Sequence, residues 1–593
     1  MRVLIVFLAL LLSLPSFAQN EALGKNYYEK GEYEKALTIF KRLAAKNPHR
    51  TEYTVYTIKS YQQLEEFEEA EKLIQKKLET PRPLATFFVE LGYNFALQEK
   101  DSLAHISYER AIREVQERPF NAYAVGRAFS DYSLLDYAVI TYETAMELEP
   151  DRNYNPQLAR IYGEQGKLDK MFEKYIDLIL QNPSYRASAQ RNFSYYINED
   201  PNNEANAMLR KTLLKKIQQR PELLFNELLS WLFIQQKEFK KAFIQEKAIY
   251  KRSDEDLRGI VDLLRIAIEE EHYEDAREIA QFVIDKAPTS QIKLEGYQYL
   301  MNVGMKIASP NDYPTIEKQY LDLFDEFGKG PETLALQIDY YHFLAFMNGR
   351  STEAIMELKK LAKEGINIYQ EARVKMKLAD ILVFDEKFNE ALIFYTQVQK
   401  KVKNDLLAQE ARFKVARTSY FKGDFDWAQI QLDVLKKSAS QLIANDAMQL
   451  ALMISDNSLE DSTRTALKKF SRADLLTLQK KETDALTLLQ DILTNHKGEK
   501  IEDEALLKSG QVYESLGQFE QAAAQYSKLI ELYNEDILAD DAHYRLAKLY
   551  EGPLAQTEKA KELYEQIIFN FADSIYFVDA RRRYRMLRGD SIN

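Results

Sequence analysis

Apolar and polar residues follow one another along most of this chain at the three- and four-residue spacing of amphipathic helices. The stretch YYEKGEYEKALTIFKRLAAKNP, residues 27–48, shows the arrangement. Gly31 marks a turn, and Ala36 and Phe40 lie four positions apart, on one face of the helix that follows. This pattern predicts a pair of antiparallel helices joined by a short turn.

The same pattern recurs at a fixed interval. An alanine returns at Ala36, Ala70, Ala104 and Ala138, 34 residues apart each time. Small residues at these positions let helix backbones approach closely, and an aromatic residue four positions later fills the gap to the next hairpin. The residues that carry this repeat in the first part of the chain are Gly24, Ala36, Phe40, Ala70, Gly92, Ala104, Tyr108, Ala138 and Tyr142.

These residues resemble the tetratricopeptide repeat, a 34-residue helix–turn–helix unit with the pattern L-G-x2-Y, then A-x3-F, then P. Leu23, Gly24, Tyr27 and Pro48 complete that pattern around Ala36 and Phe40. The resemblance implies an all-α fold, a tetratricopeptide-type α-solenoid in which antiparallel helix pairs stack into a right-handed superhelix. It also implies that the first helix of each pair lines a concave surface that binds partner proteins.

Later repeats are weaker or longer. Ala242 and Ala276 keep the spacing of 34, whereas the pattern blurs between residues 288 and 349. Clear units then return with spacings of 37 and 38, carried by Ala391, Ala428, Gly510, Ala522, Tyr526 and Ala560. The phrase ADDAHYRLA, residues 539–547, resembles repeats of bacterial envelope proteins, namely the periplasmic partner of the Tol–Pal system and the helical lipoprotein of the outer-membrane β-barrel assembly machine.

The spacing predicts two arrays joined by an irregular segment. We expect a signal peptide at 1–18, an N-terminal array of five repeats at 19–185, degenerate helix pairs at 186–288, an irregular helical joint at 289–350, and a C-terminal array of 37- to 38-residue repeats at 351–590.

The N-terminus predicts export. Arg2 precedes an apolar run from Val3 to Leu14, and Ser16 and Ala18 supply the small residues of a cleavage site. An uncleaved anchor is the alternative. The chain contains no cysteine, which excludes a lipid anchor on an N-terminal cysteine as well as disulfides. We expect a periplasmic protein without a membrane span after cleavage, with a peripheral position at the outer membrane as one form of this location.

Charge and motifs argue against several functions. The net charge of −12 disfavours nucleic acid as a partner, because its backbone attracts basic surfaces. None of the six histidines has another histidine at helical spacing, and no nucleophile, phosphate-loop or dinucleotide motif occurs. The sequence therefore predicts neither an enzyme nor a cofactor or metal site.

The resemblance places the ninth position of each first helix on the concave surface. In the first part of the chain this position holds Lys25, Lys59, Tyr93, Arg127, Arg160, Trp231 and Arg265; further on it holds Asp380, Arg417 and Gln511. The cations and aromatic rings predict a track that binds acidic or carboxylate-ended segments of other envelope proteins. A solvated face whose cations pair with neighbouring acids is the alternative.

The function predicted from the sequence is thus a non-catalytic scaffold for protein–protein interaction in a complex of the cell envelope. Two alternatives remain open at this point: a periplasmic chaperone or assembly factor for outer-membrane proteins, and a module that binds glycans or peptidoglycan through its tyrosines.

Overall fold

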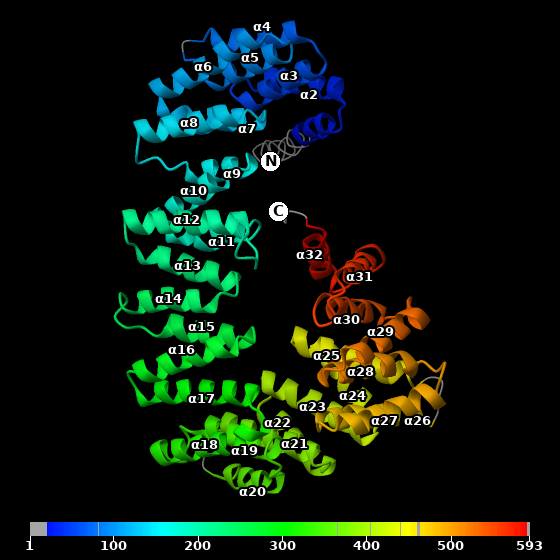
Figure 1. The fold of residues 1–593 in the computed structure, drawn as a ribbon. Coiled ribbons are helices and arrows are strands. Elements are labelled where there is room, and N and C mark those ends of the chain that lie inside the picture. Colours follow the sequence, from blue (N-terminus) through cyan, green and yellow to red (C-terminus); the bar gives the residue numbers. More distant parts are fainter. Residues whose placement is uncertain are drawn as a thin grey trace, which may run out of the picture. The chain divides into compact units, whose positions relative to one another are not determined.

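The structure is a computed structural model that describes residues 20–80, 82–364, 366–403, 405–438, 440–458 and 463–589. These residues form α-helices and short 3-10 turns and contain no β-strand (Figure 1). The predicted all-α solenoid is confirmed. The predicted signal peptide, residues 1–18, lies outside the described residues.

The chain divides into two compact units, Met1–Ser253 and Asp254–Asn593. In the first unit residues 20–29 are helical. The helices that follow are α2 (Tyr33–Lys46), α3 (Thr51–Gln63), α4 (Phe67–Leu78), α5 (Thr86–Ala96), α6 (Asp101–Glu117), η1 (Pro119–Asn121), α7 (Ala122–Asp131), α8 (Leu135–Leu148), α9 (Asn155–Glu164), α10 (Leu168–Gln181), η2 (Pro183–Tyr185), α11 (Arg186–Phe193), α12 (Glu204–Gln219), α13 (Leu223–Gln235) and α14 (Phe239–Tyr250).

The second unit continues in the same manner. Its elements are α15 (Arg258–Glu269), α16 (Tyr273–Lys286), α17 (Ser290–Ile307), η3 (Pro310–Asp312), α18 (Tyr313–Phe327), α19 (Leu334–Phe346), α20 (Ser351–Leu361), α21 (Ile368–Phe384), α22 (Phe388–Lys401), α23 (Leu406–Lys422), α24 (Phe425–Ser438), α25 (Gln441–Asp456), α26 (Thr465–Leu478), α27 (Glu482–Asn495), α28 (Ile501–Ser515), α29 (Phe519–Tyr533), α30 (Ala539–Glu551), α31 (Thr557–Asn570) and α32 (Phe577–Arg588).

The boundary between the units falls inside the segment 186–288 that the sequence suggested as degenerate pairs. Residues 289–350, predicted as an irregular helical joint, hold three helices, α17 to α19, with the 3-10 turn η3 between the first two. The buried residues of these helices include Ile316 and, four positions later, Tyr320, so that a bulky residue precedes the aromatic one where the earlier repeats have an alanine.

The turns explain how the hairpins form. In most hairpins of the described residues, one residue with a positive φ lies five positions before a buried alanine of the second helix, and Gly166 lies at the same spacing before Met171. Glycine suits this left-handed conformation because it lacks a Cβ, as at Gly31 and Gly517. The same position is occupied without glycine at Glu65, Glu99, Ser133, Lys237, Glu271, Glu386, Lys480 and Ala555.

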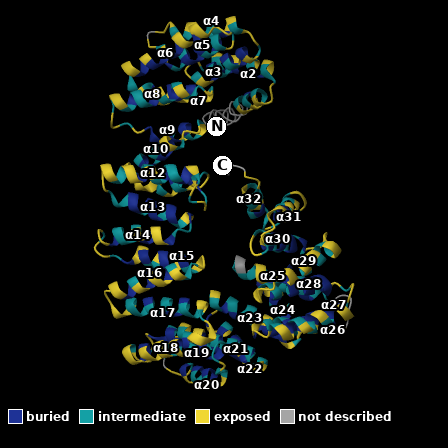
Figure 2. Ribbon diagram, viewed as in Figure 1, coloured by how far each residue is buried: buried dark blue, intermediate teal, exposed yellow. Residues whose placement is uncertain are grey.

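The seams between helices hold the core. Buried residues lie along the sides of helices that face their neighbours, and exposed residues lie on the outer sides (Figure 2). The alanines, glycines and aromatic residues that carry the repeat from Gly24 to Ala560 are buried, whereas Leu23 and Pro48, which complete the first unit's pattern, are exposed. Gly92, Gly126 and Gly510 lie directly against the rings of Tyr108, Tyr142 and Tyr526, so that an added Cβ would approach ring atoms within 2.2–2.4 Å.

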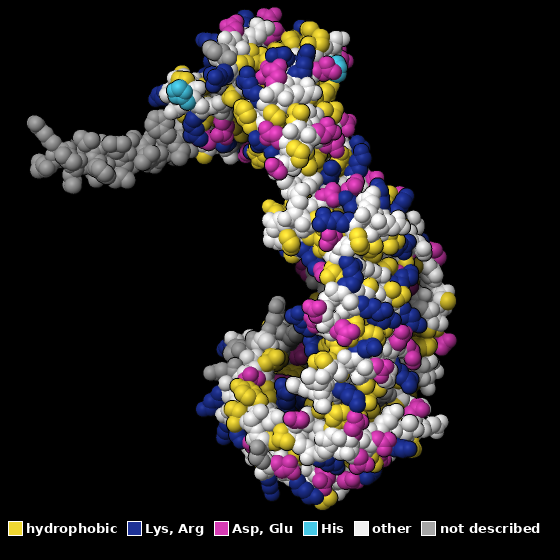
Figure 3. Space-filling model, turned by 90° about the vertical axis from the view of Figure 1, so that its left-hand side faces the viewer, with side chains coloured by type: hydrophobic (Ala, Val, Ile, Leu, Met, Phe, Trp, Pro, Cys, Tyr) yellow, Lys and Arg dark blue, Asp and Glu magenta, His cyan; other side chains and the backbone are white. Residues whose placement is uncertain are grey.

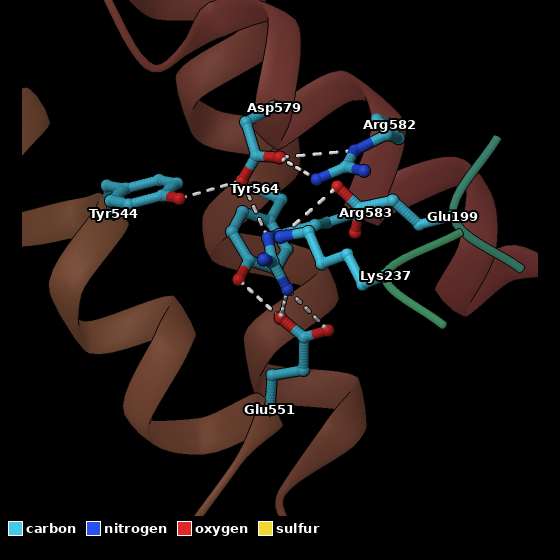
Figure 4. A network of polar contacts seen from close by, with 8 residues as sticks. All are labelled: Glu199, Lys237, Tyr544, Glu551, Tyr564, Asp579, Arg582 and Arg583. Atoms are coloured by element: carbon cyan, nitrogen blue, oxygen red, sulfur yellow. Dashed lines mark hydrogen bonds and ion pairs between the residues drawn. The ribbon is translucent and has the colours of Figure 1, made fainter. Parts of the chain in front are cut away.

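A polar network fastens the last helix of the second unit. Asp579 on α32 accepts a hydrogen bond from Tyr544 Oη at 2.7 Å and one from Arg583 Nε at 2.6 Å (Figure 4). Arg583 also donates to both carboxylate oxygens of Glu551 on α30, at 3.0 and 2.9 Å.

No helix in the described part of the chain is long and apolar enough to cross a membrane.

Candidate functional site

The residues of the predicted track all lie on first helices of hairpins. Residues 20–29, α3, α5, α7, α9, α13 and α15 carry them in chain order: Lys25, Lys59, Tyr93, Arg127, Arg160, Trp231 and Arg265. Because Arg265 belongs to the second unit, the candidate surface of the first unit consists of the residues from Lys25 to Trp231. Their surroundings differ widely.

Lys59 and Tyr93 meet at one ring. Tyr132, which follows α7, stacks on Tyr93 with 3.8 Å between ring centroids. The Nζ of Lys59 lies 4.8 Å from the centroid of the same Tyr132 ring, a cation–π distance. Tyr132, at the end of α7, therefore contacts side chains of the two preceding first helices, α3 and α5.

A buried carboxyl lies beneath this ring. Tyr132 Oη donates a hydrogen bond to Glu90 Oε2, and the Glu90 side chain is almost fully buried. Burial raises the pKa of Glu90 to about 7, against the opposing effects of the Tyr132 hydrogen bond and the Lys59 charge. When Glu90 is ionised, its negative charge therefore partly balances the positive charge of Lys59.

Lys25 is held by acids of its own surroundings. Its Nζ lies 3.0 Å from Glu21 and 2.7 Å from Glu52, and these hydrogen bonds raise the pKa of Lys25. It also lies 5.7 Å from the centroid of the Tyr56 ring. This position agrees with the alternative left open by the sequence, a cation paired with neighbouring helices.

Arg127 and Arg160 are the accessible cations of the candidate surface. Both are exposed. Arg160 Nη1 lies 3.3 Å from Glu164 Oε1 on the same helix, and nearly half of the Glu164 side chain is exposed to solvent. Arg127 has no ion pair with any residue that the structure describes. A carboxylate can therefore reach each of these guanidinium groups at little desolvation cost.

Trp231 and Arg265 have different surroundings. The Trp231 ring packs at 6.2 Å from Phe193 within the first unit. Arg265 donates hydrogen bonds to Tyr299 Oη at 2.7 Å and to Glu295 Oε1 at 3.2 Å, and both acceptors lie on α17. Within the described part of the first unit, the Trp231 ring has no ring contact with the Tyr93–Tyr132 stack.

The inward position of the first helices also lines cavities in the second unit. Asp380 and Arg417 line a cavity of about 240 Å³, and Arg417 and Gln511 line a second of about 490 Å³.

Lys and Arg are interspersed with Asp and Glu over the face shown in Figure 3, without a large area of one sign. No group of three or more potential metal ligands occurs within the described ranges.

The sequence missed Glu90 and Tyr132. Glu90 offered a signal, since it is the single charged residue in the α5 sequence TFFVELGYNFA, and a lone charge in such a helix tends to be buried with a partner. Tyr132 offered none, because it follows α7 and reaches its neighbours only when the hairpins stack.

Comparison with known proteins identifies the repeats. Sequence models of the tetratricopeptide repeat match residues 21–83 at one end and residues 504–534 and 541–574 at the other. The predicted repeat type is therefore confirmed for these stretches. No curated protein matches the chain in sequence.

Two solved structures align with nearly the whole chain, at low similarity. A chain of the APC/C hetero-tetramer Cut9–Hcn1 is 13% identical, with 95% of each chain covered and a TM-score of 0.25. A chain of Naa15/Naa10 bound to HypK-THB is 10% identical, with 97% of each chain covered and a TM-score of 0.29.

Proposed function

We propose that this protein is a scaffold without catalytic activity of its own, which binds extended segments of partner proteins on the inner helices of its first unit. The observation that supports this proposal most directly is that two exposed cations, Arg127 and Arg160, lie on consecutive first helices of a repeat array. A preformed surface of stacked hairpins loses little conformational entropy on binding, which favours capture of an extended segment.

The charge of the surface defines the partner. Arg127 and Arg160 suit acidic side chains or a terminal carboxylate, because a guanidinium binds a carboxylate through two parallel hydrogen bonds. Lys25 lies between Glu21 and Glu52 and contributes structure to the surface rather than a free charge. The binding region therefore centres on α7 and α9, and is shorter than the track expected from the sequence.

The tyrosines of this unit support the fold of the surface. Tyr93 and Tyr132 cover one face of each other, so these two rings do not offer the open platform that a sugar ring needs. This favours a protein segment over a glycan as the ligand. The location that we propose is the periplasm, as part of a cell-envelope complex, and it rests on the signal-like sequence of residues 1–18.

The test compares two charge-reversal variants of the full chain. Arg127→Glu combined with Arg160→Glu should lose the bound partner in quantitative crosslinking from an envelope fraction, and wild-type binding should weaken as salt rises. The matched control is Arg113→Glu with Lys215→Glu, which changes the net charge equally at exposed positions on α6 and α12. Equal recovery of the same partner by both double variants would contradict the proposal.

A further inference from the structure

The second unit contains a helix that the repeat does not require. The buried alanines Ala391 and Ala428 are 37 residues apart, as are Ala485 and Ala522, whereas Ala428 and Ala485 are 57 apart. The extra residues form α25, which packs on α24 through Ala447, Ala451 and other buried residues. The regular hairpins resume with α26 and α27.

This helix encloses a cavity of about 490 Å³ against the first helices of its neighbours. Leu450 and Met453 of α25 form one wall, and residues of α23, α26, α28 and α30 form the others, including Phe470 and Leu507. The volume lies within the range of about 300–1,000 Å³ that is usual for small-ligand sites. The site is therefore large enough for an apolar body and one polar group.

A carboxyl with an unused oxygen lies in the wall of the cavity. Glu504 on α28 accepts a hydrogen bond from Asn457 Nδ2, at the end of α25, through Oε1 at 2.8 Å. Its other oxygen, Oε2, is buried and accepts no hydrogen bond from an N–H or O–H donor among the described residues, and the Glu504 carboxyl lies close to the acidic side chain of Asp503. A buried polar atom without a donor is unfavourable, so a ligand donor that reaches Oε2 removes this unfavourable contribution on binding.

The remaining charges of the wall favour a cation. Carboxyl groups come from every surrounding element except α23: Asp446 and Asp456 of α25, Asp474 of α26, Glu504 of α28 and Asp541 of α30. The cations that face them are Arg417 and Lys508, and Lys508 already pairs with Asp474 at 2.5 Å. Burial, together with Asp503 next to it in sequence, raises the pKa of Glu504, as expected for a carboxyl that lacks a counter-ion.

We propose that this cavity binds the cationic end of an amphipathic ligand, a primary ammonium or guanidinium group on an apolar chain, with Glu504 as its anchoring carboxylate. The ammonium donates to Glu504 Oε2, and the apolar chain lies against Met453, Phe470 and Leu507. The ligand is either a free amine or a Lys or Arg side chain of a partner segment. This site lies in the second unit, has the opposite charge preference to the surface on α7 and α9, and does not depend on the function proposed there.

Calorimetric titration of the full chain with hexylammonium, 1-hexanol and hexanoate tests the chemistry. We expect hexylammonium to bind at least tenfold more tightly than either isostere. Because the ligand's charge shifts Glu504 to its ionised form, binding should release up to one proton, seen as a dependence of the heat on the buffer's ionisation enthalpy. Equal binding of hexanol, or no saturable binding of hexylammonium, overturns the proposal.

Variants locate the site. Glu504→Gln should weaken hexylammonium binding at least tenfold and abolish proton release, whereas Glu520→Gln, at an exposed position on α29, should change neither. Met453→Trp fills the cavity without changing its charge and should also prevent binding, which keeps the test decisive if Glu504→Gln alters folding. Unchanged affinity in both cavity variants would place the ligand elsewhere and overturn the proposal.

The source of the cation is resolved by a peptide. An acetylated, amidated Leu-Lys-Leu peptide is compared with its norleucine analogue, which lacks the ammonium group. Binding of the lysine peptide at least tenfold more tightly than hexylammonium identifies a partner side chain as the ligand. Tighter binding of hexylammonium identifies a free amine, and equal binding of the lysine and norleucine peptides contradicts the proposed role of the cation.

Discussion

The contact between Gly510 and Tyr526 is the sharpest test of how the hairpins pack. A Cβ at Gly510 would lie 2.2 Å from Tyr526 Cε1 and 2.6 Å from Cζ. The Tyr526 side chain is fully buried between α28 and its neighbours, so it has no solvent-filled space into which to move. We therefore predict that Gly510→Ala destabilises this hairpin, although alanine is the better helix former.

The size of the effect follows from two opposing contributions. Non-bonded carbon atoms prefer separations of about 3.5–4.0 Å, so the ring must move by more than about 1 Å. Overpacking of this kind costs roughly 1–3 kcal/mol, and alanine recovers about 1 kcal/mol of helix propensity. We expect a net loss of up to about 2 kcal/mol in the free energy of opening α28 and α29.

Hydrogen exchange followed by mass spectrometry on the full chain measures this opening locally, without assuming two-state unfolding. The control is Gly304→Ala on α17 in the same unit, where an added Cβ meets no atom within 4 Å. It should increase local protection by up to about 1 kcal/mol. In a Tyr526→Leu background the penalty of Gly510→Ala should largely disappear. Increased protection in Gly510→Ala alone, or an unchanged penalty in the Tyr526→Leu background, would refute the packing argument.

Three further predictions concern local energetics. Because burial raises the pKa of Glu90 to about 7, the contribution of Glu90 to the stability of the first unit should be largest below pH 4.5 and fall by up to about 3 kcal/mol as the pH rises to 7; thermal unfolding of wild type and Glu90→Gln across this range should show the difference. Glu99→Gly, which relieves a left-handed residue at φ 59°, should stabilise the α5–α6 hairpin by about 0.5–1 kcal/mol in hydrogen exchange. Asn367→Ala removes the capping box of α21 and should cost about 1 kcal/mol, measured as faster exchange in its first turn.

The hairpins could be predicted because their determinants are local. The four-residue spacing of Ala36 and Phe40 defines one helix face, and the constant interval to the next alanine shows that the unit repeats. The left-handed turn residue was visible only where glycine marks it, as at Gly31. Where the same turn contains Glu271 or Lys237, the residue type carries no such signal.

The surroundings of the candidate residues could not be predicted in the same way. Lys25 and Arg127 occupy equivalent positions in their repeats, but Glu21 and Glu52 pair with the first and no described acid pairs with the second. Such pairing depends on side chains from adjacent hairpins, whose spacing is set by tertiary packing. The long interval between Ala428 and Ala485 does indicate an inserted element, but not that α25 encloses a cavity beside Glu504.

The central claim is that the first unit binds partner segments through α7 and α9. The most direct measurement places a photo-crosslinking side chain at the exposed Tyr123, four residues before Arg127 on α7, in one sample and at Arg113, on the second helix α6, in another. We predict that the Tyr123 position crosslinks in the envelope to one recurring acidic segment of a partner, whose synthetic peptide binds wild-type protein and fails to bind Arg127→Glu/Arg160→Glu. Equal crosslinking of that segment from the Arg113 position, or peptide binding that the double substitution leaves unchanged, would contradict the claim.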